Sequence, residues 1–248
     1  MTRYCLTIEY DGSNFVGWQR QTSGPSVQES LESAIEAFTG EPSTTIAAGR
    51  TDAGVHASGQ VVHADIARVA EPRMVLLALN HHLKPLPIVV RNAWPVGPNF
   101  HARFSAKRRH YRYRILNRSA PAALERGRVW WVPEPLDLEA MRQAAVCLIG
   151  HHDFTSFRAA GCQANSPLRT LDRLAVTAQG EEIYLDLAAQ SFLHNQVRIV
   201  TGSLKWIGNG RWPPERMHEI LEARDRTQAG PTAPPHGLCL TAVDYNDS

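Results

Sequence analysis

The stretch Gly49-Arg50-Thr51-Asp52-Ala53-Gly54-Val55-His56-Ala57 connects two short predicted strands, near residues 44–48 and 60–66. Its two glycines suit a loop whose backbone turns sharply or passes close to a ligand. A single aspartate, Asp52, stands between them, two residues after Arg50. With a cation nearby, such a carboxylate can stay ionised at neutral pH and act as a nucleophile. An ordinary turn with a surface ion pair is the competing interpretation of these residues.

The elements predicted around this loop follow the order strand, helix, strand, strand, helix, strand. Residues 3–10 alternate apolar and polar side chains, as a strand does. A helix follows, with Ser26 as its cap and Glu29 completing a capping box. A second helix opening at Pro72 and a strand over residues 87–94 complete a ferredoxin-like order. The apolar stripe of the first helix consists of Val27, Leu31, Ala34, Ile35 and Phe38.

The second half repeats this order without a residue-level repeat. Residues 109–117 alternate as a strand, and Asp137 caps a helix that Gly150 ends. The inward positions of that helix are predicted to be Leu138, Met141, Ala145, Leu148 and Ile149. The later elements are a short strand at 129–132, a hairpin of residues 170–179 and 182–189, helices at 195–207 and from Pro214, and a strand at 238–245. We expect an α+β protein of two halves, residues 1–105 and 106–248, whose mixed, mainly antiparallel sheets join around a central cleft.

Length and composition describe a globular chain with room for one large domain or two small ones. It has 248 residues and a net charge of +2, with ordinary apolar and charged fractions. No apolar run is long enough to cross a bilayer, and the N-terminus has no signal-peptide core. The four cysteines are scattered without a C-x-x-C pair, which favours reduced thiols over disulfides or a zinc site. These features predict a cytoplasmic protein that does not enter membranes.

Basic residues are concentrated in one segment of the chain. Its members are Arg103, Lys107, Arg108, Arg109, Arg112, Arg114 and Arg118. This density is typical of a phosphate-binding stripe, and equally of a strand edge protected by charge. On the predicted strand, Tyr111 and Tyr113 share one face, while Arg112 and Arg114 point to the other. Because tyrosine in a strand usually packs in the core, the residues alone leave its role open.

Two histidine pairs raise the question of a metal site. His151 and His152 precede Asp153, but adjacent side chains point in different directions, and neither an H-E-x-x-H motif nor a cysteine partner accompanies them. We predict a structural or RNA-contacting loop there, and a helix end at His81-His82. No metal is expected. No cofactor is expected either, since the sequence has neither a P-loop nor a G-x-G-x-x-G motif.

Several segments together resemble the tRNA pseudouridine synthase A family over nearly the whole chain. They are residues 10–21 (YDGSNFVGWQRQ), 49–57 (GRTDAGVHA), 100–106 (FHARFSA) with 111–113 (YRY), 151–157 (HHDFTSF) and 192–198 (FLHNQVR). The chain departs from the family's pattern at Asn195, where histidine is frequent, and at Cys239, where tyrosine is frequent. Neither change moves Arg198 out of register.

The resemblance implies the pseudouridine synthase fold and an isomerase that converts uridine to pseudouridine at positions 38, 39 and 40 in the anticodon stem-loop of tRNA. The target base has to leave its stack before Asp52 acts on it as nucleophile or base. By the same resemblance, Arg198 pairs with Asp52, Tyr111 stacks on the base and Arg50 holds or replaces the flipped nucleotide. A homodimer that engages tRNA across two subunits is also implied. From the basic segment we expect further RNA contacts at Lys107, Arg112 and Arg114.

Two other classes of function stay open at this stage. A non-catalytic RNA-binding protein with two ferredoxin-like modules would need neither Asp52 nor Arg198. Such a protein usually carries an aromatic RNP-type strand, which the sequence does not contain. A metal-dependent hydrolase would use the histidines, and insensitivity to a chelator would exclude it.

Overall fold

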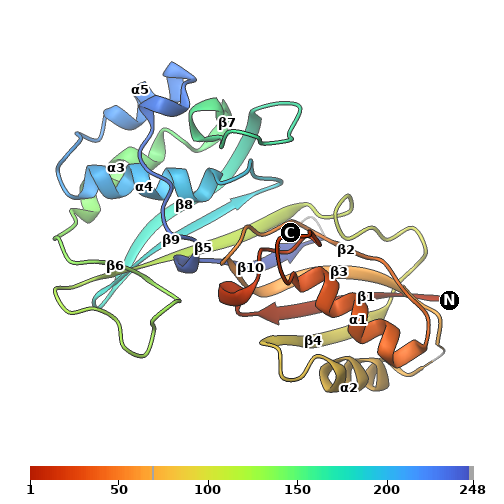
Figure 1. Ribbon diagram of the computed structural model, residues 1–248. Coiled ribbons are helices and arrows are strands. Elements are labelled where there is room, and N and C mark those ends of the chain that lie inside the picture. The colour runs from red at the N-terminus through yellow and green to blue at the C-terminus, as the bar shows by residue number, and fades with distance from the viewer. Residues whose placement is uncertain (69, 246–248) are drawn as a thin grey trace. The chain divides into compact units, whose positions relative to one another are not determined.

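The computed structural model describes residues 1–68 and 70–245. Over these residues the chain has ten strands and five α-helices (Figure 1). The mixed α+β class predicted from the sequence is confirmed. The chain divides into two compact units, unit 1 with Met1–Arg109 and Leu240–Ser248, and unit 2 with His110–Cys239. Among the described residues, no helix is both long and apolar enough to span a membrane.

Unit 1 has the predicted β-α-β-β-α-β order. Its elements are β1 (Thr2–Tyr10), α1 (Val27–Thr39), β2 (Thr45–Ala47), β3 (His56–Ile66), α2 (Pro72–His82) and β4 (Ile88–Pro95). Strand β1 lies between β4 and β3, and β2 pairs with β3, all antiparallel. On its other side β3 neighbours β10 (Leu238–Asp244), which returns from the end of the chain. Helices α1 and α2 pack against each other, and α2 also packs on β4 (Figure 1).

Helix α1 forms as its sequence predicts. The Ser26 side chain accepts a hydrogen bond from the Glu29 N–H at 3.2 Å, and Gly40 ends the helix in the left-handed conformation. All five residues of its predicted apolar stripe are buried. Truncating one of them, Leu31→Ala for example, would cost about 2–5 kcal/mol of stability. Burial of this face fixes α1 against unit 1 next to β2, the strand that leads into the Asp52 loop.

Strand β3 begins four residues earlier than the sequence predicts, at His56. The reason is its partner, because β1 pairs with β3 as far as Tyr10↔Ala57, across a bulge after Ile8. The last two residues of the stretch 49–57, His56 and Ala57, are therefore part of the sheet. The loop that holds Asp52 is correspondingly short.

Unit 2 contains most of the second half of the chain. Its elements are β5 (Arg108–Asn117), β6 (Trp130–Val132), α3 (Leu138–Val146), β7 (Gly150–Asp153), β8 (Leu168–Gln179), β9 (Glu182–Ala189), α4 (Gln196–Gly208) and α5 (Arg216–Ala223). The strand order is β5-β9-β8-β7, and β6 pairs with β5 in parallel. Helix α3 packs on α4, α5 and β8 (Figure 1).

The region around Gly150 differs from the prediction. Residues 150–153 form strand β7, antiparallel to β8, where a loop was expected. Helix α3 already ends at Val146, so the residues after it leave the helical phase. Ile149, predicted to face inward, is consequently 44% exposed, whereas Leu148 is buried. A four-residue strand carries too little local pattern to be recognised beside a histidine pair.

Candidate active site

The loop between β2 and β3 contains the aspartate that the sequence singles out. Asp52 is half-buried, Thr51 before it is buried, and Arg50 is exposed. The Asp52 side chain is thus partly accessible, whereas the residue before it is enclosed. Its geometry depends on what holds that backbone.

The segment after β1 holds one side of the loop. The Tyr10 hydroxyl and Thr51 Oγ1 lie 2.8 Å apart in a buried hydrogen bond. The Trp18 N–H donates to the Thr51 carbonyl at 3.0 Å. Gly17 has a φ of +113°, and a Cβ at this position would lie 2.7 Å from the Thr51 oxygen, so the approach requires glycine. The residue that precedes Asp52 is therefore fixed through both its side chain and its carbonyl.

Two buried polar side chains hold the other side. The Arg109 guanidinium donates to the Ala48 carbonyl from Nη2 at 2.7 Å and from Nε at 3.2 Å. Gln60 Nε2 donates to the Gly49 carbonyl at 2.7 Å. Gln60 is fully buried, and its Oε1 has no hydrogen-bond partner among the described residues. The carbonyls of Ala48 and Gly49, at the start of the loop, are thus both held by buried side chains.

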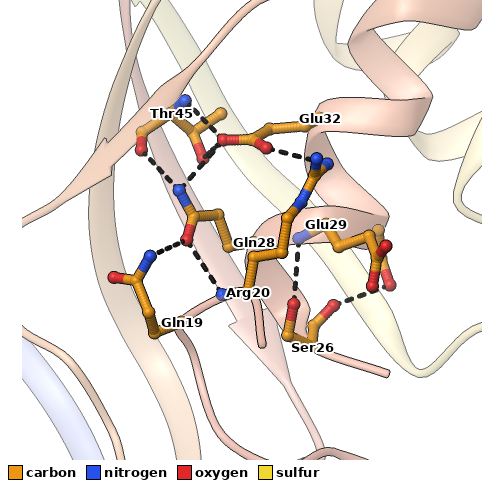
Figure 2. A network of polar contacts seen from close by, with 8 residues as sticks. Gln19, Arg20, Ser26, Gln28, Glu29, Glu32 and Thr45 are labelled. Atoms are coloured by element: carbon orange, nitrogen blue, oxygen red, sulfur yellow. Dashed lines mark hydrogen bonds and ion pairs between the residues drawn. The ribbon is translucent and has the colours of Figure 1, made fainter. Parts of the chain in front are cut away.

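A polar network on α1 supports the segment after β1 (Figure 2). Gln28 Oε1 accepts from the Gln19 side chain at 2.8 Å and from the Arg20 N–H at 3.1 Å. Its Nε2 donates to Glu32 at 3.0 Å and to the Thr45 carbonyl at 3.2 Å. Glu32 also accepts from the Thr45 N–H at 2.8 Å and forms a 3.0 Å ion pair with Arg20. One helix face thereby ties the segment after β1 to β2, the two supports of the Asp52 loop.

The first turn of α1 completes this support. Its Val27 and Gln28 N–H groups donate to the Gly17 and Trp18 carbonyls at 3.2 and 3.0 Å. Such N-terminal donors have no partner inside a helix, so the preceding segment satisfies them. Two aromatic residues of this segment, Phe15 and Trp18, are 5% and 2% exposed. Both side chains pack in the core of unit 1 and anchor the segment that bonds the Thr51 carbonyl.

Tyr111 lies on β5 in unit 2 and is 9% exposed. Its ring meets Phe192 edge to face, with centroids 5.2 Å apart and planes at 87°. The predicted alternation is confirmed, because Tyr111 and Tyr113 are both buried while Arg112 is exposed and Arg114 half-buried. The structure therefore joins two sequence motifs, the strand with Tyr111 and the segment that begins at Phe192.

Arg198 is half-buried on α4, next to the buried Val197. Its Nε donates to the Ala233 carbonyl at 2.7 Å, and its Nη1 donates to Asn195 Oδ1 at 2.7 Å. Asn195 precedes the helix with a φ of 62°, a left-handed conformation that asparagine tolerates better than most residues. The departure from the family's pattern at Asn195 thus supplies an acceptor that orients Arg198.

The expected RNA contacts Arg112 and Arg114 have carboxylate partners within unit 2. Arg112 forms a bidentate pair with Asp186 at 2.7 and 3.0 Å. Arg114 forms one with Glu182, at 2.9 Å for both bonds, and also donates to Glu125 at 2.8 Å. Hydrogen bonding to these partners raises the pKa of both arginines and, at Glu182, lowers the carboxyl pKa. An RNA phosphate would compete with these carboxylates for the same guanidinium groups.

The structure brings the predicted residues together in two sets. Arg50 and Asp52 share one loop of unit 1, and Tyr111 and Arg198 belong to unit 2 with the motif that starts at Phe192. The exposed Lys107 precedes β5. Sequence reasoning missed the positioning residues Arg109, Gln60 and Asn195. Asn195 gave a signal through its departure from the family's pattern, and Arg109 gave one through its place on the same strand face as Tyr111 and Tyr113.

The histidine pair in β7 has local hydrogen bonds. His151 Nδ1 lies 3.0 Å from Thr170 Oγ1, and His152 Nε2 lies 2.9 Å from the Ile149 carbonyl. Across residues 1–68 and 70–245, no three His, Cys, Asp or Glu side chains gather as metal ligands would. These hydrogen bonds hold both imidazoles beside β7. The other pair, His81-His82, ends α2 as predicted.

Comparison with known proteins gives one consistent result. The model of the family described as tRNA pseudouridine synthase matches residues 6–105 and 144–246. The tRNA pseudouridine synthase A of Sinorhizobium fredii is 56% identical over 247 residues, covering 99% of this chain and all of the relative. That of Paramagnetospirillum magneticum is 57% identical over 248 residues, covering 100% and 97%. That of Rhodospirillum centenum is 56% identical over 245 residues, covering 99% and 100%. The residues matched by the family model include Arg50, Asp52 and Arg198. Tyr111, Lys107, Arg112 and Arg114 lie between its two matched ranges.

Proposed function

We propose a target site and a catalytic residue for this chain, which belongs to the tRNA pseudouridine synthase family and isomerises uridine to pseudouridine in tRNA. The proposed targets are uridines 38, 39 and 40 of the anticodon stem-loop. The proposed catalytic group is the carboxylate of Asp52. The targets follow from the resemblance of the loop at 49–57, the FHARFSA segment and the FLHNQVR segment to the family's motifs.

One observation carries the assignment of Asp52. Its loop is held by buried hydrogen bonds on both sides, from Tyr10 to Thr51 and from Arg109 to Ala48, while the Asp52 side chain is half-buried. A reacting group has to be fixed by its surroundings before the substrate arrives, and supports of this kind serve that purpose. An ordinary surface turn with an ion pair would not need such supports.

The reaction balances without a cofactor. The target base leaves its stack, and Asp52 attacks the uridine at the base or the ribose. The bond between N1 and the ribose breaks, the uracil turns, and C5 forms the new bond to the ribose. The bond between Asp52 and the uridine then breaks, which returns the free carboxylate. The proton on C5 is lost and N1 gains one, so product and substrate have the same composition. No electron transfer and no co-substrate are required.

The family resemblance assigns roles to three further residues. By the family resemblance, Arg198 is assigned as the cation that pairs with the catalytic aspartate. Its orientation by Asn195 and Ala233 supports this role, because a guanidinium held at two points loses little freedom on pairing. Tyr111 is assigned to stack on the base, and the exposed Arg50 to hold the flipped nucleotide.

Incubation with unmodified tRNA, followed by mapping of pseudouridine by position, tests the proposal. We expect pseudouridine at positions 38 to 40, lost in Asp52→Asn with tRNA affinity largely kept. Glu36→Gln, an exposed neutralisation on α1, is the matched control and should retain full turnover. Modification elsewhere would overturn the target assignment. Loss of affinity equal to the loss of rate would overturn the catalytic assignment.

The homodimer is a separate part of the proposal, supported by the family resemblance. Sedimentation velocity of the purified protein tests it directly. A single species at the mass of one chain would reject it without affecting the role of Asp52. The cytoplasm is the proposed location, since tRNA is the substrate.

A further inference from the structure

A tight turn in the FHARFSA segment places an aromatic ring in solvent. Phe104 is 78% exposed. The turn is held by the Ser105 N–H donating to the His101 carbonyl at 2.8 Å, and by the His101 N–H donating to Ser105 Oγ at 3.1 Å. His101 Nδ1 also accepts from the Arg103 and Phe104 N–H groups at 3.2 and 3.1 Å. The exposed ring therefore stands on a backbone that is closely fixed.

The Phe104 ring is supported from one side. It stacks on the His101 imidazole, with centroids 4.3 Å apart and planes at 27°. His101 in turn packs against His63, at a centroid distance of 4.9 Å, and His63 is buried. His63 Nδ1 accepts from the Ala102 N–H at 3.0 Å, which anchors the same turn to β3. The His101 ring thus covers one face of Phe104, and His101 is fixed by the turn and by His63. The rest of the Phe104 ring is exposed to solvent.

The charge beside the ring is positive. The Arg103 guanidinium carbon lies 5.8 Å from the Phe104 centroid. Arg103 is exposed, and none of the described carboxylates forms an ion pair with it. Lys107, three residues after Phe104, is exposed as well. An apolar protein partner would be met by a broader apolar patch, whereas a single ring beside cations suits a nucleobase and its phosphate.

We propose that Phe104 is a stacking platform for an unpaired base of the tRNA substrate, with Arg103 binding a neighbouring phosphate. The inference rests on the proposed function in one respect: because Tyr111 is assigned to the reacting uridine, the platform is assigned to a different base. The platform contributes to affinity and to the position of the RNA, not to the chemical step. Aromatic stacking accepts any base, so it discriminates between paired and unpaired nucleotides more than between sequences.

Three substitutions at Phe104 test the platform by tRNA affinity, saturating single-turnover rate and thermal melting. Phe104→Ala should weaken tRNA binding roughly 5- to 100-fold, the range for loss of one stacked base. Phe104→Trp should bind tRNA about as tightly as wild type. Phe104→Leu, which keeps apolar volume without a π-system, should bind as weakly as Phe104→Ala. The rate at saturating enzyme and the melting temperature should stay at wild-type values. Leu124→Ala, which removes another exposed apolar side chain, should leave affinity unchanged.

Other outcomes would overturn the platform. If Phe104→Ala binds tRNA as tightly as wild type, Phe104 is not a stacking platform. If Phe104→Leu binds tRNA as tightly as Phe104→Trp, the contact is only apolar and needs no π-system. Dissociation of a dimer by Phe104→Ala would show that a second copy of the chain covers the ring. Failure of the proposed function is distinguishable, since Asp52→Asn tests turnover at intact affinity, while Phe104→Ala tests affinity at intact turnover.

Discussion

The Arg109 guanidinium and the Ala48 carbonyl are joined by two hydrogen bonds in the interior of unit 1, at 2.7 and 3.2 Å. The same guanidinium donates to the Arg103 carbonyl at 2.6 Å and to the Ala106 carbonyl at 3.2 Å. Arginine suits this place because its five N–H donors point outward in a rigid fork. One side chain thereby connects the start of the Asp52 loop with the turn that presents Phe104.

Arg109→Lys should separate this positioning role from simple folding. A lysine keeps the charge, but its three donors leave a single nitrogen and cannot reproduce the spread fork with which the guanidinium reaches the Ala48, Ala106 and Arg103 carbonyls. Each buried carbonyl left unpaired costs about 1–3 kcal/mol. We expect stability to fall by about 3 kcal/mol and the rate at saturating tRNA to fall at least tenfold. Urea unfolding and single-turnover assays measure the two effects. Arg68→Lys, whose native guanidinium bonds the Phe38 carbonyl away from the Asp52 loop, should keep the rate. A wild-type rate in Arg109→Lys would contradict the role.

Two tyrosines on β1 offer a matched pair. The Tyr10 hydroxyl bonds Thr51 beside Asp52, and the Tyr4 hydroxyl donates to the Ala70 carbonyl at 2.6 Å. Replacing either by phenylalanine removes one hydrogen bond and should cost about 1 kcal/mol of stability. Only Tyr10→Phe should also lower the single-turnover rate, by several-fold, because only its partner adjoins the carboxylate. Equal rates in the two variants would mean that this hydrogen bond does not position Asp52.

Local patterns predicted much of unit 1. The cap at Ser26 and the stripe of α1 depend on residues a few positions apart, and both are present in the structure. The Asp52 loop was recognisable because its glycines and its carboxylate are adjacent in sequence. The boundary of β3 was predicted less well, since it depends on pairing with β1.

Contacts between distant residues could not be predicted in the same way. Arg109 lies 61 positions from Ala48. Strand alternation places Arg109 on the face of Tyr111 and Tyr113, but it does not indicate which carbonyls the buried guanidinium binds. Charge density indicates how many cations are present, not where their partners lie. The Arg112 and Arg114 pairs on β9 have separations of 74 and 68 positions and depend on strand pairing. For the same reason the basic segment alone could not separate RNA contacts from internal ion pairs.

Asn195 should affect the reaction through Arg198. Asn195→Gly keeps the left-handed backbone but removes the acceptor for Arg198 Nη1, so we expect the single-turnover rate to fall about tenfold at little cost in stability. Asn195→Asp keeps an acceptor and should retain most of the rate. Arg224, at the end of α5, also has a left-handed backbone. Arg224→Gly is therefore the control and should leave the rate unchanged. Equal rates in Asn195→Gly and wild type would contradict the link.

His63 should make stability depend on pH below neutrality. Burial lowers its pKa from the ordinary value of 6.5, and the charges of Arg3 and His101 lower it further. The unfolded chain therefore binds the proton first, so stability is full above pH 6.5 and is lost as the pH falls toward the folded pKa. Protonation of Nδ1 would also remove the acceptor for the Ala102 N–H.

Urea unfolding between pH 7.5 and 5.5 measures this dependence. His63→Asn places an oxygen near the position of Nδ1 without a titrating ring, so its stability should fall less steeply with acid. His218→Asn removes an exposed histidine on α5 and should keep the wild-type slope. The assignment to His63 fails if His63→Asn keeps the wild-type slope too.

Arg112 and Asp186 decide between the two interpretations of the basic segment. If Arg112 binds a tRNA phosphate, the RNA has to displace Asp186, and Asp186→Asn should tighten binding by freeing the guanidinium. Arg112→Gln should then weaken binding and reduce the slope of log affinity against log salt by about one. Glu182→Gln and Arg114→Gln form the equivalent pair, and Lys107→Gln reports on an exposed cation. If neither arginine changes the salt slope and both carboxylate variants lower only stability, the pairs are internal ties of the sheet, and the phosphate track lies on residues such as Arg103 and Lys107.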